Sequence, residues 1–383
     1  MEVDGEMQCL LNDAALELGR LDGLTVNLPN PDLFLSMYVR KEALLSSQIE
    51  GTQASLDDVL AYEVQGESQR SADAVEVVNY VRAMNHGLER LKEFPLSLRL
   101  IREIHGVMLE DIRGNEKMPG EFRKSQNWIG SAGSTIETAA FVPPPPHAVQ
   151  PALGKLEKFL HSKLPIPVLL RCALVHAQFE TIHPFLDGNG RVGRLLITFL
   201  LCHDGALQRP LLYLSYYFKL HRSEYYDRLN AVRFNGDWEG WTKFFLRGVI
   251  EVARQAALTA KRILELRAGH LEMVRKARPK GANNALTLLD LLYMAPYQTA
   301  TTVGKRLKIS IPTANALIST FQGIGILQQV NRTSWGRIYA FNPYLDLLRE
   351  GTEVVVSARP NRAASRHTTR STSKKQRNLR RTK

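Results

Sequence analysis

The sequence predicts a mainly α-helical fold with a small β-hairpin and a C-terminal winged helix-turn-helix. Apolar residues recur at helical spacing over most of the 383 residues, whereas strand-like stretches are few and short. The last part of the chain shows three helical patterns followed by a pair of strand patterns, which is the order of a winged helix. A chain of this length can form two or three domains around a sizeable core.

The first predicted unit, residues 1–94, is a helical region. Its clearest helix covers 33–50 and ends at Gly51, because glycine readily adopts the left-handed conformation that terminates helices. Two further helices are expected over 56–63 and 72–92.

The second unit, residues 95–250, is predicted to be the core. A segment rich in turn formers, 113–146, divides it and contains two short strand patterns, 127–130 and 140–142, that could pair as a hairpin before the prolines at 143–146. The expected helices of this unit cover 97–112, 150–162, 166–182, 192–203 and 215–232.

Three further units follow the core. A long helical pattern over 237–277 runs into a helical linker, 251–281. The winged helix module, 282–346, has expected helices over 285–293, 300–307 and 312–322 and strands over 326–330 and 337–341. Residues 347–383 are predicted to be a disordered basic tail, because they contain little that could be buried.

The positive charge of the chain lies mostly in that tail. There are 50 Lys and Arg against 38 Asp and Glu, and the net charge of +12 at first suggests a nucleic-acid or membrane-surface binder. Ten of the basic residues and no acidic residue lie from Ser357 onward, which leaves a balance of only +2 before it. We expect the tail either to bind nucleic acid weakly and without sequence preference or to be solvated.

Three scattered cysteines, Cys9, Cys172 and Cys202, are too few for a disulfide framework and favour a reduced compartment. The N-terminus lacks the basic and then apolar pattern of a signal peptide, and the most apolar stretch, 195–202, is too short to span a membrane. We therefore expect a cytoplasmic protein that does not bind membranes.

The segment from His183 to Arg194, HPFLDGNGRVGR, carries the most chemistry. A histidine on a loop can act as a general base near neutral pH, and an aspartate such as Asp187 offers the oxygen ligand that Mg²⁺ prefers. The Gly188-Asn189-Gly190 run lets backbone N–H groups converge on an anion at the start of a helix. Two arginines three positions apart, Arg191 and Arg194, can then each bind a phosphate. Together these residues predict a nucleotide-phosphate site, against the alternative of an ordinary loop-to-helix junction.

This segment resembles the signature of the Fic family, His-Pro-Phe-x-Asp/Glu-Gly-Asn-Gly-Arg-x-x-Arg, at every defined position. Residues 177–182 and 119–146 also look like this family, and the similarity extends over 10–345. The resemblance implies a helical core and, as in most characterised members, transfer of AMP from ATP to a hydroxyl group of a protein.

The resemblance also implies a role for each residue of the signature. His183 would deprotonate a Ser, Thr or Tyr hydroxyl of the target protein, and Asp187 would hold Mg²⁺. The phosphates of ATP would be bound by Gly188, Asn189, Gly190, Arg191 and Arg194. Members that phosphorylate their targets carry Lys in place of Gly190, which favours adenylyl transfer here. A phosphocholine transferase, and an enzyme that also removes AMP, stay open.

A second motif, Ser46-Ser-Gln-Ile-Glu50-Gly51, lies at the end of the early helix. Ser46 and Glu50 share a helix face, so Glu50 is either a solvated carboxylate or an acid that reaches a guanidinium. Many Fic proteins carry an inhibitory Ser/Thr-x-x-x-Glu-Gly/Asn motif. By this resemblance, Glu50 would pair with Arg194 and block productive placement of the γ-phosphate.

The resemblance makes 126–142 a flap that aligns the target by strand pairing, with Ile129, Thr135 and Thr138 as docking candidates. An ordinary surface hairpin is the alternative. The remaining histidines His105, His147 and His176 lack metal-spaced partners, so we interpret them as structural or surface residues.

The winged helix module leaves its partner open. Its predicted recognition helix, 312–322, has no Lys or Arg, although Lys305, Arg306, Lys308, Arg332 and Arg337 lie nearby in sequence. It could contact DNA phosphates, dock a protein or form a homodimer. Two functions follow: an autoinhibited adenylyltransferase that modifies a protein target or itself, or a DNA-binding regulator with a nucleotide-sensing domain. The intact His183, Asp187 and arginines favour the enzyme.

Overall fold

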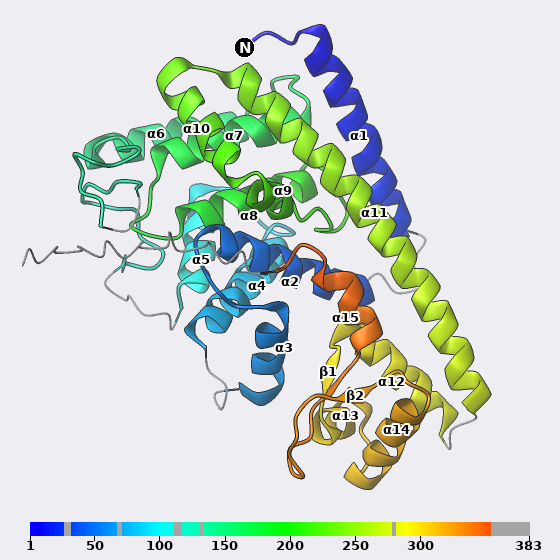
Figure 1. Ribbon diagram of the computed structural model, residues 1–383. Helices are drawn as coiled ribbons and strands as arrows, with labels where there is room; N and C mark the ends of the chain where they lie inside the picture. Colours follow the sequence, from blue (N-terminus) through cyan, green and yellow to red (C-terminus); the bar gives the residue numbers. More distant parts are fainter. Residues whose placement is uncertain (27–31, 67–70, 111–116, 131–132, 278–280, 354–383) are drawn as a thin grey trace, which may run out of the picture.

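The structure is a computed structural model that describes residues 1–26, 32–66, 71–110, 117–130, 133–277 and 281–353. It is mostly helical and contains a small antiparallel sheet, so the predicted mainly α fold class is confirmed (Figure 1). Among the described residues, no helix combines the length and apolar character that a membrane crossing requires.

Two helices, α7 (Val168–Ile182) and α8 (Asn189–His203), form the centre of the core. They pack against each other, and three helices described below also contact α8: α2 (Asp32–Ile49), α4 (Ala72–Arg90) and α5 (Leu98–Met108). Almost every residue of α8 is buried, including Leu195, Leu196 and Phe199, because its apolar residues surround the whole helix rather than one face. This burial fixes the N-terminal end of α8, where the candidate site lies.

The N-terminal helices agree with their predicted positions to within a few residues. They are α2 (Asp32–Ile49), α3 (Leu56–Gln65), α4 (Ala72–Arg90) and α5 (Leu98–Met108). Helix α2 ends where Gly51 has a φ of +110°, and α3 begins at the N-cap Ser55, whose side chain accepts a hydrogen bond from the Asp58 backbone N–H.

The remaining core helices are α6 (Pro146–Leu160), α9 (Ser215–Leu220) and α10 (Arg222–Asn235). Helix α6 begins four residues before its predicted start, since a proline is well suited to the first helical position. The helix predicted over 215–232 is wrong as a single element: His221 has a φ of −106° and a ψ of 39°, and it separates α9 from α10.

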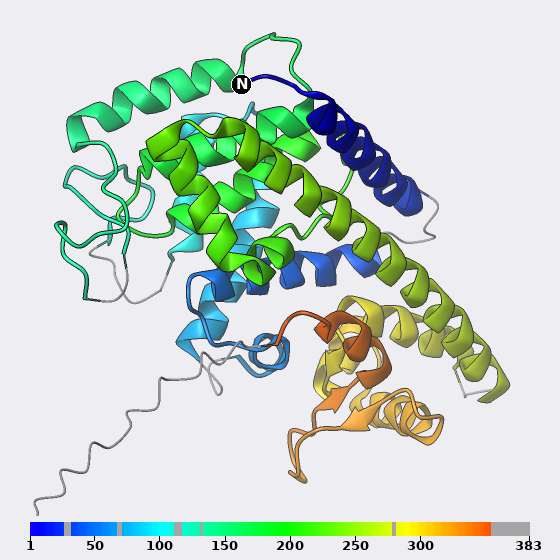
Figure 2. The same cartoon turned by 45° about the horizontal axis from the view of Figure 1, so that its top comes forward.

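The two longest helices lie side by side along one edge of the molecule (Figures 1 and 2). They are α1 (Gly5–Val26), for which we predicted no bounds, and α11 (Trp238–Ala277). Lys243 of α11 pairs with Asp4 and Glu6 at the start of α1, at 2.6 and 2.7 Å. The predicted boundary between core and linker, at 250/251, falls inside α11, so one continuous helix leads to the C-terminal module.

The C-terminal module contains α12 (Ala282–Met294), α13 (Ala300–Leu307) and α14 (Ile311–Gly323). Its sheet has the order β1-β3-β2, with β1 (Tyr297–Gln298), β2 (Gln328–Gln329) and β3 (Tyr339–Ala340) all antiparallel. The paired strands are two residues long instead of the predicted five, and β1 was not predicted.

Helix α15 (Asn342–Arg349) corrects the predicted start of the disordered tail at 347. Tyr344, Leu345 and Leu348 lie on one helix face and are buried, and the helix packs against α11. The backbone continues in a described conformation to Glu353, with Thr352 buried. The predicted tail from 354 to 383 lies outside the described residues.

Candidate active site

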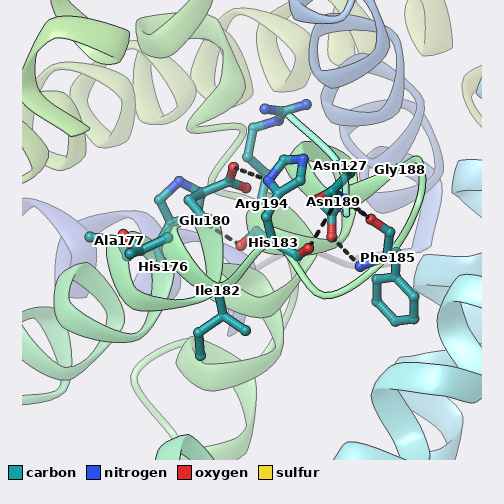
Figure 3. Close-up of polar contacts among 12 residues, drawn as sticks. Asn127, His176, Ala177, Glu180, Ile182, His183, Phe185, Gly188, Asn189 and Arg194 are labelled. Atoms are coloured by element: carbon teal, nitrogen blue, oxygen red, sulfur yellow. Dashed lines mark hydrogen bonds and ion pairs between the residues drawn. The ribbon is translucent and has the colours of Figure 1, made fainter. Parts of the chain in front are cut away.

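The candidate site is built on the short loop that joins α7 to α8 (Figure 3). His183 ends α7 in the left-handed conformation, with a φ of 49°, and Gly188 precedes α8 with a φ of 77°. The side chain of Asn189 closes the loop, because its Oδ1 accepts from the Phe185 N–H and its Nδ2 donates to the Phe185 carbonyl, both at 2.8 Å. Asn189 thus shapes the loop through its side chain.

A left-handed conformation is unusual for histidine, and neighbouring side chains hold it in place. The His183 carbonyl accepts hydrogen bonds from Arg123 Nε at 2.9 Å and from Asn127 Nδ2 at 3.4 Å. The Arg123 backbone N–H donates to the Pro184 carbonyl at 2.8 Å, so the turn-rich segment fixes both residues. Neither Arg123 nor Asn127 was predicted as a site residue.

The imidazole of His183 lies beside the buried carboxyl group of Glu180, with 4.0 Å between His183 Nδ1 and Glu180 Oε2 (Figure 3). Burial and the positive charge of Arg233 lower the pKa of His183 to about 4. The ring is therefore neutral at physiological pH and able to accept a proton.

Asp187 is half-buried at the rim of the site. Its Oδ1 accepts from the Gly188 N–H at 2.7 Å, and its Oδ2 contacts Lys117 Nζ. Burial alone would raise the pKa of Asp187, but the hydrogen bond from Lys117 and the charge of Arg191 lower it, so the carboxylate is ionised.

The donor set at Asp187 fits one kind of metal site. No group of three or more His, Cys, Asp and Glu that could hold a metal ion exists within the described part of the chain. A single carboxylate suits Mg²⁺ that takes its other ligands from substrate phosphates and water, and does not suit a closed protein site.

The two arginines are both buried but bind different helices. Arg191 Nη1 contacts Glu76 of α4, and Arg191 Nη2 lies 3.6 Å from Asp187 Oδ1. Arg194 binds α2 and the residue that follows it: its Nε donates to Ser46 Oγ at 2.8 Å, and its Nη2 donates to the Ser46 carbonyl at 3.0 Å and to Glu50 Oε1 at 2.6 Å. The structure therefore brings Ser46, Glu50 and Arg194 together, as the sequence motifs imply.

The carboxylate of Glu50 lies directly over the start of α8. A Cβ added to Gly190 would stand 2.1 Å from Glu50 Oε1, so only a glycine leaves room for this approach. Burial would raise the pKa of Glu50, but the charge and hydrogen bond of Arg194 outweigh it and lower the pKa. A negatively charged group of the protein thus lies at the helix N-terminus that an anionic ligand would use.

A cavity of about 310 Å³ connects these groups. Glu50, His183, Asp187, Gly190, Arg191 and Arg194 line one part of it. Tyr225, Tyr226 and Arg233 of α10 and Trp128 and Ile129 of the predicted flap line the rest. Tyr225 and Tyr226 belong neither to the signature segment nor to the early Ser46 to Gly51 motif. Only their place on α10, whose position could not be predicted, brings them to the site.

The flap is less regular than predicted. In place of the two predicted strands, its described residues form an antiparallel bridge, in which Ile129 and Phe141 exchange N–H to O bonds of 2.8 and 3.1 Å. Ile129 lines the cavity, whereas Thr135 and Thr138 are exposed and hydrogen-bond to each other in a turn. Target docking at these residues stays a prediction.

Two histidines that we interpreted as structural or surface residues are structural and support the site. His105 is fully buried, and its Nδ1 accepts from the Gly120 N–H at 2.8 Å. Its Nε2 must then carry the proton and donates to the Asp187 carbonyl at 3.0 Å. His176, also buried, bonds the Gly193 carbonyl and the Tyr225 hydroxyl. His147 is exposed and lies away from the cavity lining.

Two family models match the chain: the Fic/DOC family N-terminal region over residues 9–89 and the Fic/DOC family over residues 95–201. A probable protein adenylyltransferase of Aquifex aeolicus is 30% identical over 180 residues, which are 45% of this chain and 51% of that protein. The protein adenylyltransferase Fic of Aedes aegypti is 34% identical over 152 residues, 39% of this chain and 27% of that protein. The chain thus spans about half, or less, of the length of these relatives.

Solved structures show the same fold. A Fic family protein from Desulfovibrio desulfuricans G20 superposes with a TM-score of 0.59 at 19% identity, covering 89% of this chain and 97% of that chain. A Fic domain containing signaling protein from Bacteroides thetaiotaomicron has a TM-score of 0.53 at 20% identity, covering 65% and 97%. At these identities the likeness establishes the fold alone.

Proposed function

Because the chain belongs to the Fic/DOC family, we propose that it is a protein adenylyltransferase, which transfers AMP from ATP to a protein hydroxyl and is inhibited by its own Glu50. The observation that carries this proposal is the contact of Glu50 with Arg194 over Gly190, in a cavity that also contains His183 and Asp187. Two curated relatives named protein adenylyltransferases support the reaction.

The reaction follows from the groups that line the cavity. Neutral His183 accepts the proton of a Ser, Thr or Tyr hydroxyl as the oxygen attacks the α-phosphorus of ATP. The new bond joins that oxygen to the α-phosphorus, and the bond from the α-phosphorus to the bridging oxygen breaks, which releases pyrophosphate. Backbone N–H groups at Gly188 to Gly190, together with Arg191 and Arg194, stabilise the negative charge of the phosphates.

Asp187 is the residue that would hold Mg²⁺, and the ion would supply further positive charge to the phosphates. Lys117 now neutralises Asp187 from the exposed side, and it would have to move if the ion binds. Most of the rate enhancement then comes from positioning and charge, as in other phosphoryl transfers.

Inhibition follows from charge and space. Glu50 places a carboxylate at the anion site and engages Arg194, which would otherwise bind the γ-phosphate. Arg194 is almost fully buried, so removing Glu50 leaves its guanidinium short of a partner and ready for a phosphate.

The test compares wild-type protein with Glu50→Gly, incubated with ATP labelled at the α-phosphate and a cell lysate. We expect strong labelling of the variant, in itself or in lysate proteins, and weak labelling by wild type. Labelling should disappear in Glu50→Gly combined with His183→Ala. Equal labelling by wild type and Glu50→Gly would exclude the inhibitory role, and labelling without His183 would exclude it as the base.

The C-terminal module supports a second candidate function, DNA binding by what we interpret as a winged helix-turn-helix. Residues 281–341 contain five Lys and Arg but only one acidic residue, Asp290, which pairs with Arg267. None of the five, Lys305, Arg306, Lys308, Arg332 and Arg337, forms an ion pair with a described residue, and the intervening Trp335 is 90% exposed. Gel shifts with duplex DNA that are lost in Arg332→Ala/Arg337→Ala would support this function. Shifts that depend only on residues 357–383 would assign binding to the tail.

We further propose a reduced, cytoplasmic location, since the cysteines Cys9, Cys172 and Cys202 are all free.

A further inference from the structure

Residues 350–353, here called the C-terminal strap, follow α15 and contact α2, the helix that ends one residue before Glu50. Lys41 and Gln48 are both on α2, and each donates to the strap: Lys41 Nζ to the Glu350 carbonyl at 2.7 Å and Gln48 Nε2 to the Thr352 carbonyl at 3.1 Å. The chain thus returns from the C-terminal module to bind α2 directly, and α2 is here called the inhibitory helix because it leads into Glu50.

Lys219 of α9 binds the other two strap carbonyls. Its Nζ donates to Gly351 O at 3.3 Å and to Glu353 O at 2.6 Å, and it also donates to Gln48 Oε1 at 2.7 Å. All four successive carbonyls of the strap therefore accept hydrogen bonds from side chains of α2 and α9. Gln48, which takes part in both sets of contacts, lies two residues before Glu50.

The strap is tightly coupled to α2 because it provides the hydrogen-bond acceptor of the buried Lys41 amine. Lys41 is only 2% exposed, and among the described residues its sole hydrogen bond is the one to Glu350. The rings of Tyr213 and Tyr216 lie with their centroids 4.6 and 5.9 Å from Lys41 Nζ. If the strap leaves, a buried amine loses its acceptor, which is costly unless α2 also moves.

The strap also fits closely at Gly351. This residue has a φ of +78°, and an added Cβ would stand 2.1 Å from the ring of Tyr216. A larger residue there must shift the strap or the ring and is strained in any position.

Two further contacts brace the same region from the C-terminal module. Ser36 Oγ, near the start of α2, donates to the Met294 carbonyl at 2.9 Å. Arg349 Nη2 donates to Asp57 of α3 at 2.8 Å, just before the strap begins. The module therefore holds the start of α2 and the first turn of α3, while the strap binds Lys41 and Gln48 further along α2.

We propose that the C-terminal strap is a clamp on the inhibitory helix, in which Lys41, Gln48 and Lys219 are positioning residues that keep Glu50 against Arg194. Release of the strap lets α2 move and turns the enzyme on. This inference rests on the proposed inhibitory role of Glu50.

The first experiment substitutes Gly351 in the full-length protein and uses Gly325 as its match. Both glycines have a φ of +78°, but a Cβ on Gly325 meets nothing within 4 Å. Gly351→Ala should increase deuterium uptake in residues 41–50 and raise labelling by α-labelled ATP by about tenfold, the effect of losing one hydrogen bond to a charged group. Gly325→Ala should leave both unchanged.

The second experiment breaks the clamp from the other side. Lys219→Met should reproduce Gly351→Ala, whereas Lys243→Met, which removes the lysine that ties α1 to α11, should change neither readout. In a Glu50→Gly background, neither Gly351→Ala nor Lys219→Met should increase labelling further, because the clamp acts through Glu50.

The outcomes separate this inference from the proposed function. Unchanged deuterium uptake in residues 41–50 of both variants, or higher uptake without more labelling when Glu50→Gly is active, would overturn the clamp. A rise of the same size in the Glu50→Gly background would overturn its action through Glu50. If Glu50→Gly itself transfers no AMP, the proposed function fails, and the deuterium uptake still decides whether the strap holds α2.

Discussion

Buried polar side chains set the shape of the site at the level of single residues. His105 ties the Asp187 carbonyl to the Gly120 N–H, and its ring stacks on Phe185 with 3.7 Å between centroids. Burial lowers the pKa of His105 to about 4, so the ring stays neutral and keeps both bonds. A residue far from the signature in sequence therefore positions the residue proposed to hold the metal.

We expect His105→Ala to lower AMP transfer in the Glu50→Gly background by on the order of 10–100-fold, because it releases the loop that carries Asp187. It should also lower the free energy of unfolding by about 1–3 kcal/mol, since two buried backbone groups lose their partner. Initial labelling rates and urea unfolding measure the two effects. His147→Ala, an exposed histidine, is the control, and equal effects of both changes would contradict a positioning role.

The protonation state of His183 predicts an unusual pH profile. With a pKa lowered to about 4 by burial, His183 is already the free base at every pH well above that value. The Glu50→Gly variant should therefore keep a constant kcat/KM between about pH 8 and pH 6, where an ordinary histidine would lose activity. A loss of activity centred near the usual histidine pKa of about 6.5 would show that the lowered pKa of His183 does not govern catalysis.

At the scale of elements, close packing around α8 holds the anion site in place. Gly87 of α4 faces Phe199 of α8, and an added Cβ would stand 2.4 Å from the ring. Gly193 of α8 similarly faces Glu180 of α7, where a Cβ would stand 2.4 Å from Oε1. These glycines allow three helices to meet at close range.

Substitution of Gly87 should reveal this packing. We expect Gly87→Ala to lower the free energy of unfolding by about 1–3 kcal/mol, because the added methyl group overlaps the Phe199 ring. Gly154→Ala in α6, where the Cβ meets nothing within 4 Å, should instead raise it by about 0.5–1 kcal/mol through helix propensity. Urea unfolding of both variants provides the measurement, and destabilisation of equal size would argue against the packing explanation.

The helices were largely predictable from the sequence because their apolar periodicity is strong and several ends carry clear signals. Gly51 marks the end of α2 as expected, and the predicted start of the next helix at residue 56 matches α3. Strands β2 and β3 lie inside the two predicted strand patterns, although they are shorter. Strand β1 was not predicted, because its pairing depends on contacts between segments far apart in sequence, such as Tyr297 with Ala340. Helix α15 was missed because the basic composition of the tail concealed the short apolar face of Tyr344, Leu345 and Leu348.

Over the whole molecule, several buried ionisable groups link stability to pH. Burial lowers the pKa values of His105, His176 and His183 to about 4, 3 and 4 and raises those of Glu42 and Glu180 to about 7. Around pH 5.5 the unfolded chain would bind nearly three protons at the histidines, while the folded protein holds about two at the glutamates. The unfolded state thus binds about one proton more, and stability rises with pH in this range.

We predict that the free energy of unfolding falls by on the order of 1 kcal/mol per pH unit from about pH 6.5 to pH 4.5 as a result of these five groups. His176→Gln removes one of the histidine protons from the unfolded state, so its stability should change less over the same range. Urea unfolding of both proteins at the two pH values tests this. An equal decrease in both would show that His176 is not buried in its neutral form.

The candidate site was predictable in part. The signature residues and the Ser46 to Gly51 motif carry their own chemistry in sequence, and the structure places Glu50 beside Arg194 in a cavity that His183, Asp187 and Arg191 also line. Glu180, Arg123, Asn127 and Lys117 were not predicted, because their roles depend on where the turn-rich segment and α7 lie in space. No local pattern in the sequence distinguishes such residues from ordinary polar ones.

The contact of Glu50 with Arg194 has a consequence for how the protein responds to its nucleotide. Glu50 is a ligand covalently attached to its own receptor, so its local concentration is fixed by the geometry of α2 and does not change when the protein is diluted. Under the proposed function, ATP would compete with this tethered anion, and its apparent affinity for the productive pose would be reduced in proportion to the fraction of molecules in which the site is free. Nucleotide affinity would then depend on the position of α2, and any agent that displaces α2 would increase the affinity for ATP without contacting the nucleotide site.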